Sequence, residues 1–138
     1  MEEKILQDAY GVIAELWCSP QDVDMTEVRS NAEEIVEGLM STDEETAMML
    51  ARFLSSDIIA DEDYIDLFEL EPKCSLYLGS HSFDEPKTCA GAGVSDRNDY
   101  MIEVAGIYRH FGKAISGNEL PDYLPLMIDF LSLSFIFK

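Results

Sequence analysis

Apolar residues along most of the chain recur every three or four positions, which is the spacing of one face of an α-helix. The first such stripe contains Ile5, Leu6, Ala9, Val12, Ile13, Leu16 and Trp17. Glu2 and Glu3 precede it, where negative charge stabilises a helix N-terminus, and Ser19-Pro20 follows it, where proline ends a helix. The pattern therefore predicts an amphipathic helix over residues 2–18.

Two more helices are predicted in the first half of the chain. The second stripe covers residues 28–39, with Gly38 near its end. Thr42 and Glu45 have the spacing of a capping box, in which each side chain bonds the backbone N–H of the other residue. The third helix is therefore expected to begin at this pair and to continue to Leu54.

The helical period stops after a short fourth helix, which is predicted over residues 62–68. Residues 71–95 contain prolines and glycines without a helical period, so they are predicted to form one long loop. Loops of this length are often functional. Gly91-Ala92-Gly93 is interpreted as a flexible part of this loop, because no strand precedes it and no phosphate-binding lysine follows it.

Two helices are predicted after the long loop. The first carries a stripe over residues 101–115, with Gly117 placed to end it. The second covers residues 124–135, and Pro125 is tolerated only in its first turn because proline lacks an N–H. Asp122 is then the predicted N-cap, with its carboxylate bonding a free N–H of that turn.

The chain shows no convincing strand pattern and no internal repeat, and its 138 residues fit one domain of ordinary size. Hydrophobic residues make up 47% of it, which is enough for a core. The predicted fold is all-α: a compact single-domain helical bundle of about six helices with one long central loop, spanning residues 1–138.

The formal net charge of −19 is concentrated in the first half of the chain. Residues 1–72 contain 20 acidic and 3 basic side chains, whereas residues 73–138 contain 8 and 6. An acidic surface repels phosphate backbones, so nucleic acid is not an expected partner, and it attracts a basic peptide or protein face. Acidic surfaces also serve solubility or adaptation to a salty cytoplasm, and charge alone leaves both interpretations open.

Signals for export, membrane insertion and metal binding are weak. The N-terminus is acidic, and the most apolar stretch, residues 124–137, is shorter than a membrane span and contains Asp129. A cytoplasmic protein without a membrane span is therefore expected. Cys18, Cys74 and Cys89 are widely spaced and form no CxxC pair, so idle reduced thiols are expected instead of a metal site.

The sequence lacks the motifs of nucleotide-binding enzymes, zinc proteases and serine hydrolases, so no enzymatic activity is predicted. A catalytic alternative would use His81 as a base for a nearby serine or for Cys74. Glu119 and Asp122 flank a proline at a helix start. They are interpreted either as helix caps or as a carboxylate pair presented to a basic ligand.

Several stretches together are similar to a known family. They are residues 67–70 (LFEL), 74–86 (CSLYLGSHSFDEP), 108–112 (YRHFG), 118–125 (NELPDYLP) and 128–131 (IDFL), with the opening segment that ends LWCSP at residues 16–20. The Glu-Leu-Pro-Asp-Tyr-Leu element at residues 119–124, followed by Asp129 and Phe130-Leu131, is the most specific part. On these residues the chain resembles redox-enzyme maturation chaperones of the NarJ/TorD/DmsD type, including nitrate reductase delta-subunit-like assembly proteins.

The resemblance implies an all-helical cytoplasmic chaperone with no catalytic residues, no metal site and no cofactor of its own. Such proteins bind the N-terminal segment of the catalytic subunit of a molybdenum oxidoreductase, a twin-arginine leader or its remnant, during cofactor insertion. The implied peptide-binding residues are Tyr77, Gly79, Ser80, His81, Asp84, Glu85, Pro86, Tyr108, Glu119, Pro121, Asp122 and Tyr123. A leader with two arginines and an apolar stretch requires carboxylates beside an apolar groove. Among the implied residues, Glu119 and Asp122 would supply the carboxylates and the aromatic residues would supply the groove.

The chain departs from the family pattern in three places. Tyr123 stands where many members have histidine, which removes a group that titrates near neutral pH. Asp129 replaces the more usual glutamate. Members generally continue with further helices, so the apolar residues 135–137 are expected to promote self-association, giving a homodimer or an exchange of segments. The alternative function is an acidic helical protein-interaction module without a role in cofactor insertion.

Overall fold

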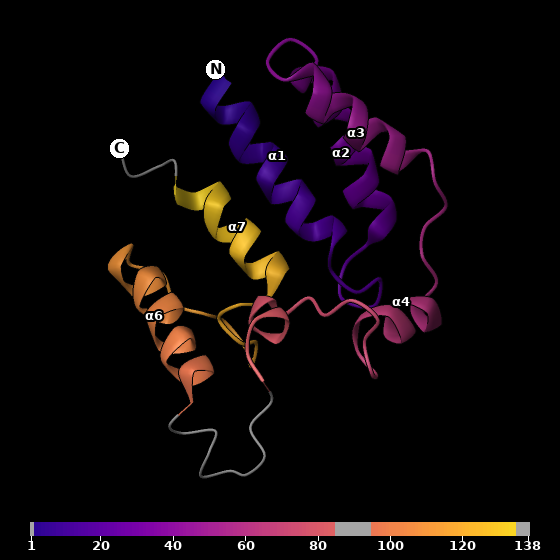
Figure 1. Cartoon of the computed structure of the whole chain (residues 1–138). Coiled ribbons are helices and arrows are strands. Elements are labelled where there is room, and N and C mark those ends of the chain that lie inside the picture. The colour runs from indigo at the N-terminus through magenta and orange to yellow at the C-terminus, as the bar shows by residue number, and fades with distance from the viewer. Residues whose placement is uncertain (1, 85–94, 135–138) are drawn as a thin grey trace.

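The computed structural model describes residues 2–84 and 95–134 of the chain (Figure 1). These ranges contain six α-helices and one 3-10 helix, and no strand. The elements are α1 (Glu2–Leu16), α2 (Met25–Leu39), α3 (Glu44–Leu54), α4 (Asp61–Phe68), the 3-10 helix η1 (Leu78–His81), α6 (Asp96–His110) and α7 (Leu124–Ser134). The prediction of an all-α bundle of about six helices is confirmed.

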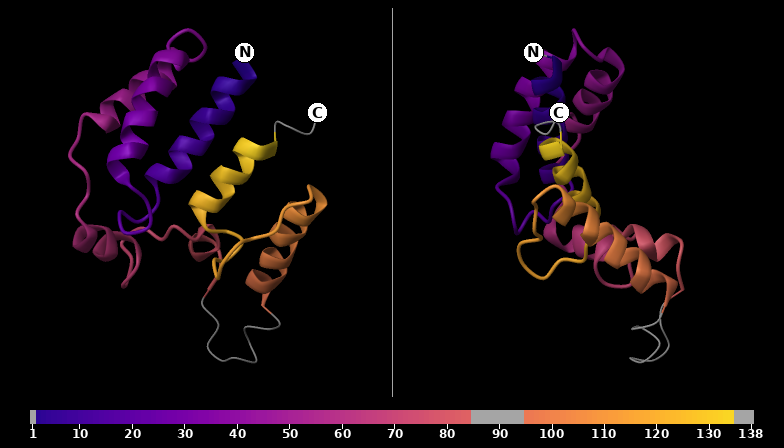
Figure 2. Two further views of the ribbon diagram at one scale, coloured as in Figure 1. Left: turned by 180° about the vertical axis from the view of Figure 1, so that it is seen from behind. Right: turned by 90° about the vertical axis from the view of Figure 1, so that its left-hand side faces the viewer.

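Helices α1, α2, α3 and α7 form the main body of the molecule. Helix α1 packs against α2 on one side and α7 on the other, and α3 packs on α2 (Figures 1 and 2). The buried core of this body consists of Ala9, Val12, Val28, Ala32, Leu39, Ala47 and Leu50. Its alanines let the helix backbones approach closely, and its larger aliphatic side chains supply the buried apolar area. None of the described helices is long and apolar enough to cross a bilayer.

The N-terminus of α3 lies one residue away from the predicted position. The N-cap is Asp43, and the proposed capping box of Thr42 and Glu45 is wrong. The Asp43 carboxylate accepts hydrogen bonds from the backbone N–H and the hydroxyl of Thr46, at 3.0 and 2.7 Å. These bonds stabilise the charged form and lower the pKa of Asp43. The adjacent aspartate caps the helix because its carboxylate can accept both bonds from one threonine.

The C-terminus of α6 comes earlier than predicted. Gly112 adopts a positive φ of 71°, its N–H donates to the carbonyl of Arg109, and the N–H of Lys113 donates to the carbonyl of Tyr108, both at 2.9 Å. This is the Schellman arrangement, in which a glycine in the left-handed conformation ends a helix. Gly112 ends α6 in place of Gly117, so the predicted extension of this helix to Ile115 is wrong.

The predicted loop over residues 71–95 contains one ordered element in its described part. Helix η1 forms a single turn, and the bonds described below hold it against the start of α7. Residues 85–94, which include Cys89 and Gly91-Ala92-Gly93, lie outside the described residues, as do the apolar residues 135–137. The predicted self-association through that apolar segment therefore stays a prediction.

Candidate functional site

Two segments that lie far apart in the sequence meet at the start of α7. The N–H of Leu124 donates to the carbonyl of Leu76 at 2.8 Å, and the N–H of Leu78 donates to the carbonyl of Asp122 at 3.1 Å. Tyr77 and Tyr123 form an isolated antiparallel bridge between these bonds, with ring centroids 5.3 Å apart. The segment before η1 and the segment before α7 are therefore joined by backbone hydrogen bonds.

Asp122 lies inside this junction and is completely buried. Its Oδ2 accepts a hydrogen bond from the N–H of Gly79 at 2.6 Å, and its Oδ1 has no partner among the described residues. The prediction that Asp122 caps α7 is wrong, because Leu124 donates to a backbone carbonyl and the Asp122 carboxylate is turned toward η1. A Cβ at position 79 would lie 2.7 Å from Oδ2 and 3.1 Å from the Tyr100 ring, so the junction requires glycine there.

A cavity of about 370 Å³ lies beside the junction. Its walls come from the segment after α1, from α4, from the segment around η1, from α6 and from the segment before α7. The lining residues are Asp22, Tyr64, Phe68, Glu69, Pro72, Ser75, Leu76, Tyr77, Ser80, Arg97, Glu119, Leu120 and Tyr123. Exposed carboxylates at Asp22, Glu69 and Glu119 therefore line the cavity together with four aromatic side chains and the guanidinium of Arg97.

The tyrosines of the site are hydrogen-bond donors that stay neutral. The Tyr77 hydroxyl donates to Oε2 of Glu119 at 2.8 Å, and burial together with this bond raises the pKa of Tyr77. Burial and the neighbouring Tyr64 hydroxyl raise the pKa of Tyr123 in the same direction. Burial raises the pKa of Tyr108 to about 12. The charge presented by the cavity therefore comes from its carboxylates and from Arg97.

The structure divides the predicted site residues into three groups. Tyr77, Ser80, Glu119 and Tyr123 line the cavity. Gly79, Tyr108, Pro121 and Asp122 lie behind it and support its walls: Gly79 bonds to Asp122 as described, and the Tyr108 hydroxyl donates to the carbonyl of Pro121 at 2.6 Å. The remaining predicted residues do not line it or are not described: His81, Asp84, Glu85 and Pro86.

The residues of this third group differ in their placement. His81 has its Nε2 2.8 Å from the carbonyl of Ser75, so this ring nitrogen is engaged with the backbone. The catalytic alternative for His81 thus gains no support from this contact. Asp84 is exposed at the end of the described segment. Glu85 and Pro86 lie outside the described residues.

Helix α4 supplies a wall that the sequence prediction did not include. Tyr64 and Phe68 are one helical turn apart, with ring centroids separated by 4.9 Å. The Tyr64 hydroxyl donates to the carbonyl of Trp17 at 2.8 Å, and the Trp17 ring lies edge-on to Phe68 at 6.0 Å. These contacts fix α4 beneath the end of α1. The spacing of Tyr64 and Phe68 could have indicated one aromatic face, but not the cavity that it faces.

The described part of the chain offers little for metal or thiol chemistry. Residues 2–84 and 95–134 contain no group of three histidine, cysteine or acidic side chains that could hold a metal ion. Cys18 is partly buried, and burial followed by the charge of Asp22 raises the pKa of its thiol to about 11. Cys74 is exposed. Neither thiol lines the cavity.

No protein-family model matches the chain, and no curated protein sequence matches it significantly. The similarity of its motifs to the chaperone family therefore stands without support from a relative. The cavity and the junction beside it are the physical basis for a functional proposal.

Proposed function

We propose that this protein is an assembly chaperone of the NarJ/TorD/DmsD type. It binds the arginine-bearing N-terminal segment of the catalytic subunit of a molybdenum oxidoreductase while the cofactor is inserted into that subunit. The observation that carries the proposal is the acid-edged aromatic cavity at the place where the segments around Tyr77 and Glu119 meet. These two segments are among those that resemble the family.

The chemistry of the cavity suits an arginine followed by apolar residues. A guanidinium forms strong charge-assisted hydrogen bonds with carboxylates and also lies favourably over tyrosine rings. Glu119 and the paired rings of Tyr77 and Tyr123 offer both contacts within one wall. Phe68 and Leu120 offer apolar surface for the residues that follow. The volume of about 370 Å³ falls within the range of roughly 300–1,000 Å³ that is usual for ligand pockets.

Glu119 can accept the guanidinium without losing its existing bond. A carboxylate has about four lone-pair positions, and the Tyr77 hydroxyl uses one of them on Oε2. Oε1 can therefore accept from an arginine while Tyr77 keeps Glu119 oriented. In this proposal Glu119 recognises the charge, whereas Asp122 and Gly79 fix the wall on which Glu119 and Tyr77 lie.

The test is a binding measurement with a labelled synthetic twin-arginine leader peptide. Glu119→Gln removes the charge but keeps the shape, and it is expected to weaken binding at least about tenfold, because a charge-assisted bond is worth roughly 1.5–3 kcal/mol. Replacing both arginines of the peptide by alanine should weaken binding at least as much. Glu103→Gln, an exposed carboxylate of α6 outside the cavity, is the matched control and should leave the affinity unchanged.

The second candidate is an acidic helical interaction module without a role in cofactor insertion. It is favoured by the 20 acidic and 3 basic side chains of residues 1–72. Such a module would bind any basic peptide equally and weakly, and moderate salt would abolish the binding. If any basic peptide bound equally weakly, and if Glu119→Gln and Glu103→Gln bound the leader peptide with equal affinity, the interaction-module function would be favoured over the chaperone function. Co-purification from the native source would then identify the partner.

A further inference from the structure

The face of α3 that points away from the core is unusually apolar. Met48, Met49 and Phe53 are 59%, 67% and 52% exposed, although the opposite face buries Ala47 and Leu50. Met49 and Phe53 are one turn apart, so their side chains are neighbours. Single exposed apolar residues are ordinary on protein surfaces, but a contiguous group on one helix face marks an interaction site.

Met48 and Met49 border an open hollow of about 620 Å³. It is lined by Glu44, Glu45, Met48, Met49 and Arg52. The two methionines occupy its middle, the carboxylates its N-terminal end and the guanidinium its C-terminal end. Methionine side chains are flexible and polarisable, so they adapt to the shape of an apolar group that packs on them. The 11 residues of α3 give this surface a length of about 16 Å.

Glu44 and Glu45 line the hollow, and the rest of the α2 and α3 surface is acidic as well. Six exposed carboxylates lie on α2 and α3, at Glu27, Glu33, Glu34, Glu37, Glu44 and Glu45. The two helices carry Arg29 and Arg52 as their basic residues, and the Arg29 guanidinium donates to the backbone carbonyls of Leu54 and Ser56. A second copy of the chain would bring the same carboxylates and a net charge of −19, which repels. A cationic partner is attracted.

We propose that the outer face of α3 is a docking surface for a basic amphipathic helix of another protein. Apolar side chains of that helix, spaced at i, i+3, i+4 and i+7, pack on Met48 and Met49. Its lysines or arginines pair with Glu44 and Glu45, and one acidic residue faces Arg52. Glu44 and Glu45 lie seven to eight residues before Arg52, about 11 Å along the helix. The basic and acidic residues of the partner helix therefore need the same spacing to pair with them.

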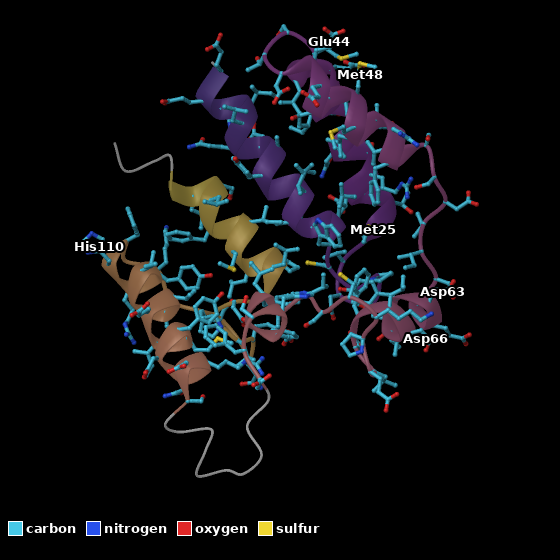
Figure 3. All side chains as sticks on the ribbon, in the orientation of Figure 1. Met25, Glu44, Met48, Asp63, Asp66 and His110 are labelled. Carbon is cyan, nitrogen blue, oxygen red and sulfur yellow. The ribbon has the colours of Figure 1, made fainter. Side chains whose placement is uncertain are left out.

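This surface is distinct from the cavity. No residue of α3 lines the cavity, and Figure 3 shows Glu44 and Met48 at the outer end of the α2–α3 hairpin, opposite to the end where α4 carries Asp63 and Asp66. The docking surface therefore does not depend on the function proposed for the cavity. The chain could hold an arginine-bearing tail in the cavity and a basic helix on α3 at the same time.

The test uses the full chain and a synthetic peptide of about 14 residues, long enough to cover α3, with leucines at i, i+3, i+4 and i+7, one glutamate placed to face Arg52 and lysines elsewhere. A peptide of the same composition with scrambled leucines is the ligand control. The unaltered chain is expected to bind the patterned peptide at least about tenfold more tightly. Met48→Ser/Met49→Ser should weaken this binding about tenfold, and Glu44→Gln/Glu45→Gln should reduce both the affinity and its salt dependence.

Ile102→Ser/Ile107→Ser is the matched control variant. These α6 residues are 56% and 50% exposed, so the substitutions remove similar apolar area elsewhere, and the affinity should not change. Equal binding of the patterned and scrambled peptides, or full affinity in Met48→Ser/Met49→Ser, would overturn the proposal. A dimer in sedimentation that the Met48→Ser/Met49→Ser variant abolishes would also overturn it, because the occupant would then be a second copy. Glu119→Gln should not affect this peptide, which separates the result from the proposed function.

Discussion

The bond between Asp122 and Gly79 gives the sharpest prediction for the site. Asp122→Ala removes the acceptor and leaves the N–H of Gly79 unpaired in a buried position, which costs about 1–3 kcal/mol. Asp122→Asn keeps an acceptor for that N–H, so it is expected to lose less stability than Asp122→Ala. Urea unfolding followed by circular dichroism measures these losses, which are large against the usual total of about 5–15 kcal/mol.

The same contact predicts that two harmful substitutions partly compensate each other. In Gly79→Ala the new Cβ would lie 2.7 Å from Oδ2 of Asp122, and overpacking of this kind costs about 1–3 kcal/mol. In the double variant Asp122→Ala/Gly79→Ala that oxygen is absent, so only the Tyr100 ring, 3.1 Å away, still crowds the new methyl group. The combined loss should fall short of the sum of the single losses by about 1 kcal/mol or more.

Additive losses would refute this account of the junction. If the two single effects summed to within about 0.5 kcal/mol, the Asp122 carboxylate would not lie against Gly79. A loss of only about 1 kcal/mol in Asp122→Ala, with leader binding intact, would instead fit a helix cap. Under the proposed function, leader binding should fall together with stability in this variant, because Ser80 of the cavity wall lies in η1 and Tyr77 directly precedes it.

Two further predictions concern the tyrosines. Burial raises the pKa of Tyr108 to about 12 in the folded protein, so the unfolded chain loses this proton at a lower pH than the folded chain does. The free energy of unfolding should therefore fall between about pH 10 and 12. Urea unfolding across that pH range should show that the free energy of unfolding falls less steeply in Tyr108→Phe than in the unaltered chain. If the two proteins gave parallel curves of unfolding free energy against pH, the raised pKa of Tyr108 would be wrong. Tyr77→Phe keeps the ring beside Tyr123 and frees Oε2 of Glu119, so leader affinity, measured by fluorescence anisotropy, should stay within about threefold of the unaltered chain. A loss as large as that of Glu119→Gln would instead identify the Tyr77 hydroxyl as the recognition group.

The helices could be predicted from the sequence because their signals are local. A stripe of apolar residues at helical spacing needs no knowledge of the rest of the chain, and α1, α2 and α4 appear within one to three residues of their predicted limits. Two of the errors at helix ends arose where two residues of suitable type stand within five positions of each other. Asp43 caps α3 next to Thr42, and Gly112 ends α6 before Gly117. Local spacing could not rank these competitors.

The site could be predicted only in part, because it depends on tertiary contacts. The motif placed Tyr77, Glu119 and Tyr123 in one group, and all three line the cavity. It did not include Tyr64, and Phe68, although part of the stretch 67–70, was not assigned to the peptide-binding residues; both reach the cavity through the path of the chain after α3. Asp122 was assigned to the helix beside it in sequence, whereas its carboxylate bonds a glycine more than 40 positions away.

The two kinds of residue at the site therefore have different expected roles. Asp122, Gly79, Pro121 and Tyr108 belong to the motif segments but lie behind the cavity, where they join η1 to the start of α7. Since α7 packs along α1, this junction ties the cavity wall to the main body of the bundle. Substitutions behind the wall should change the geometry for every ligand alike. Substitution of an exposed lining residue from outside the motif, such as Asp22, should instead change which tail binds, because it alters the contacts without breaking the bonds that hold the wall.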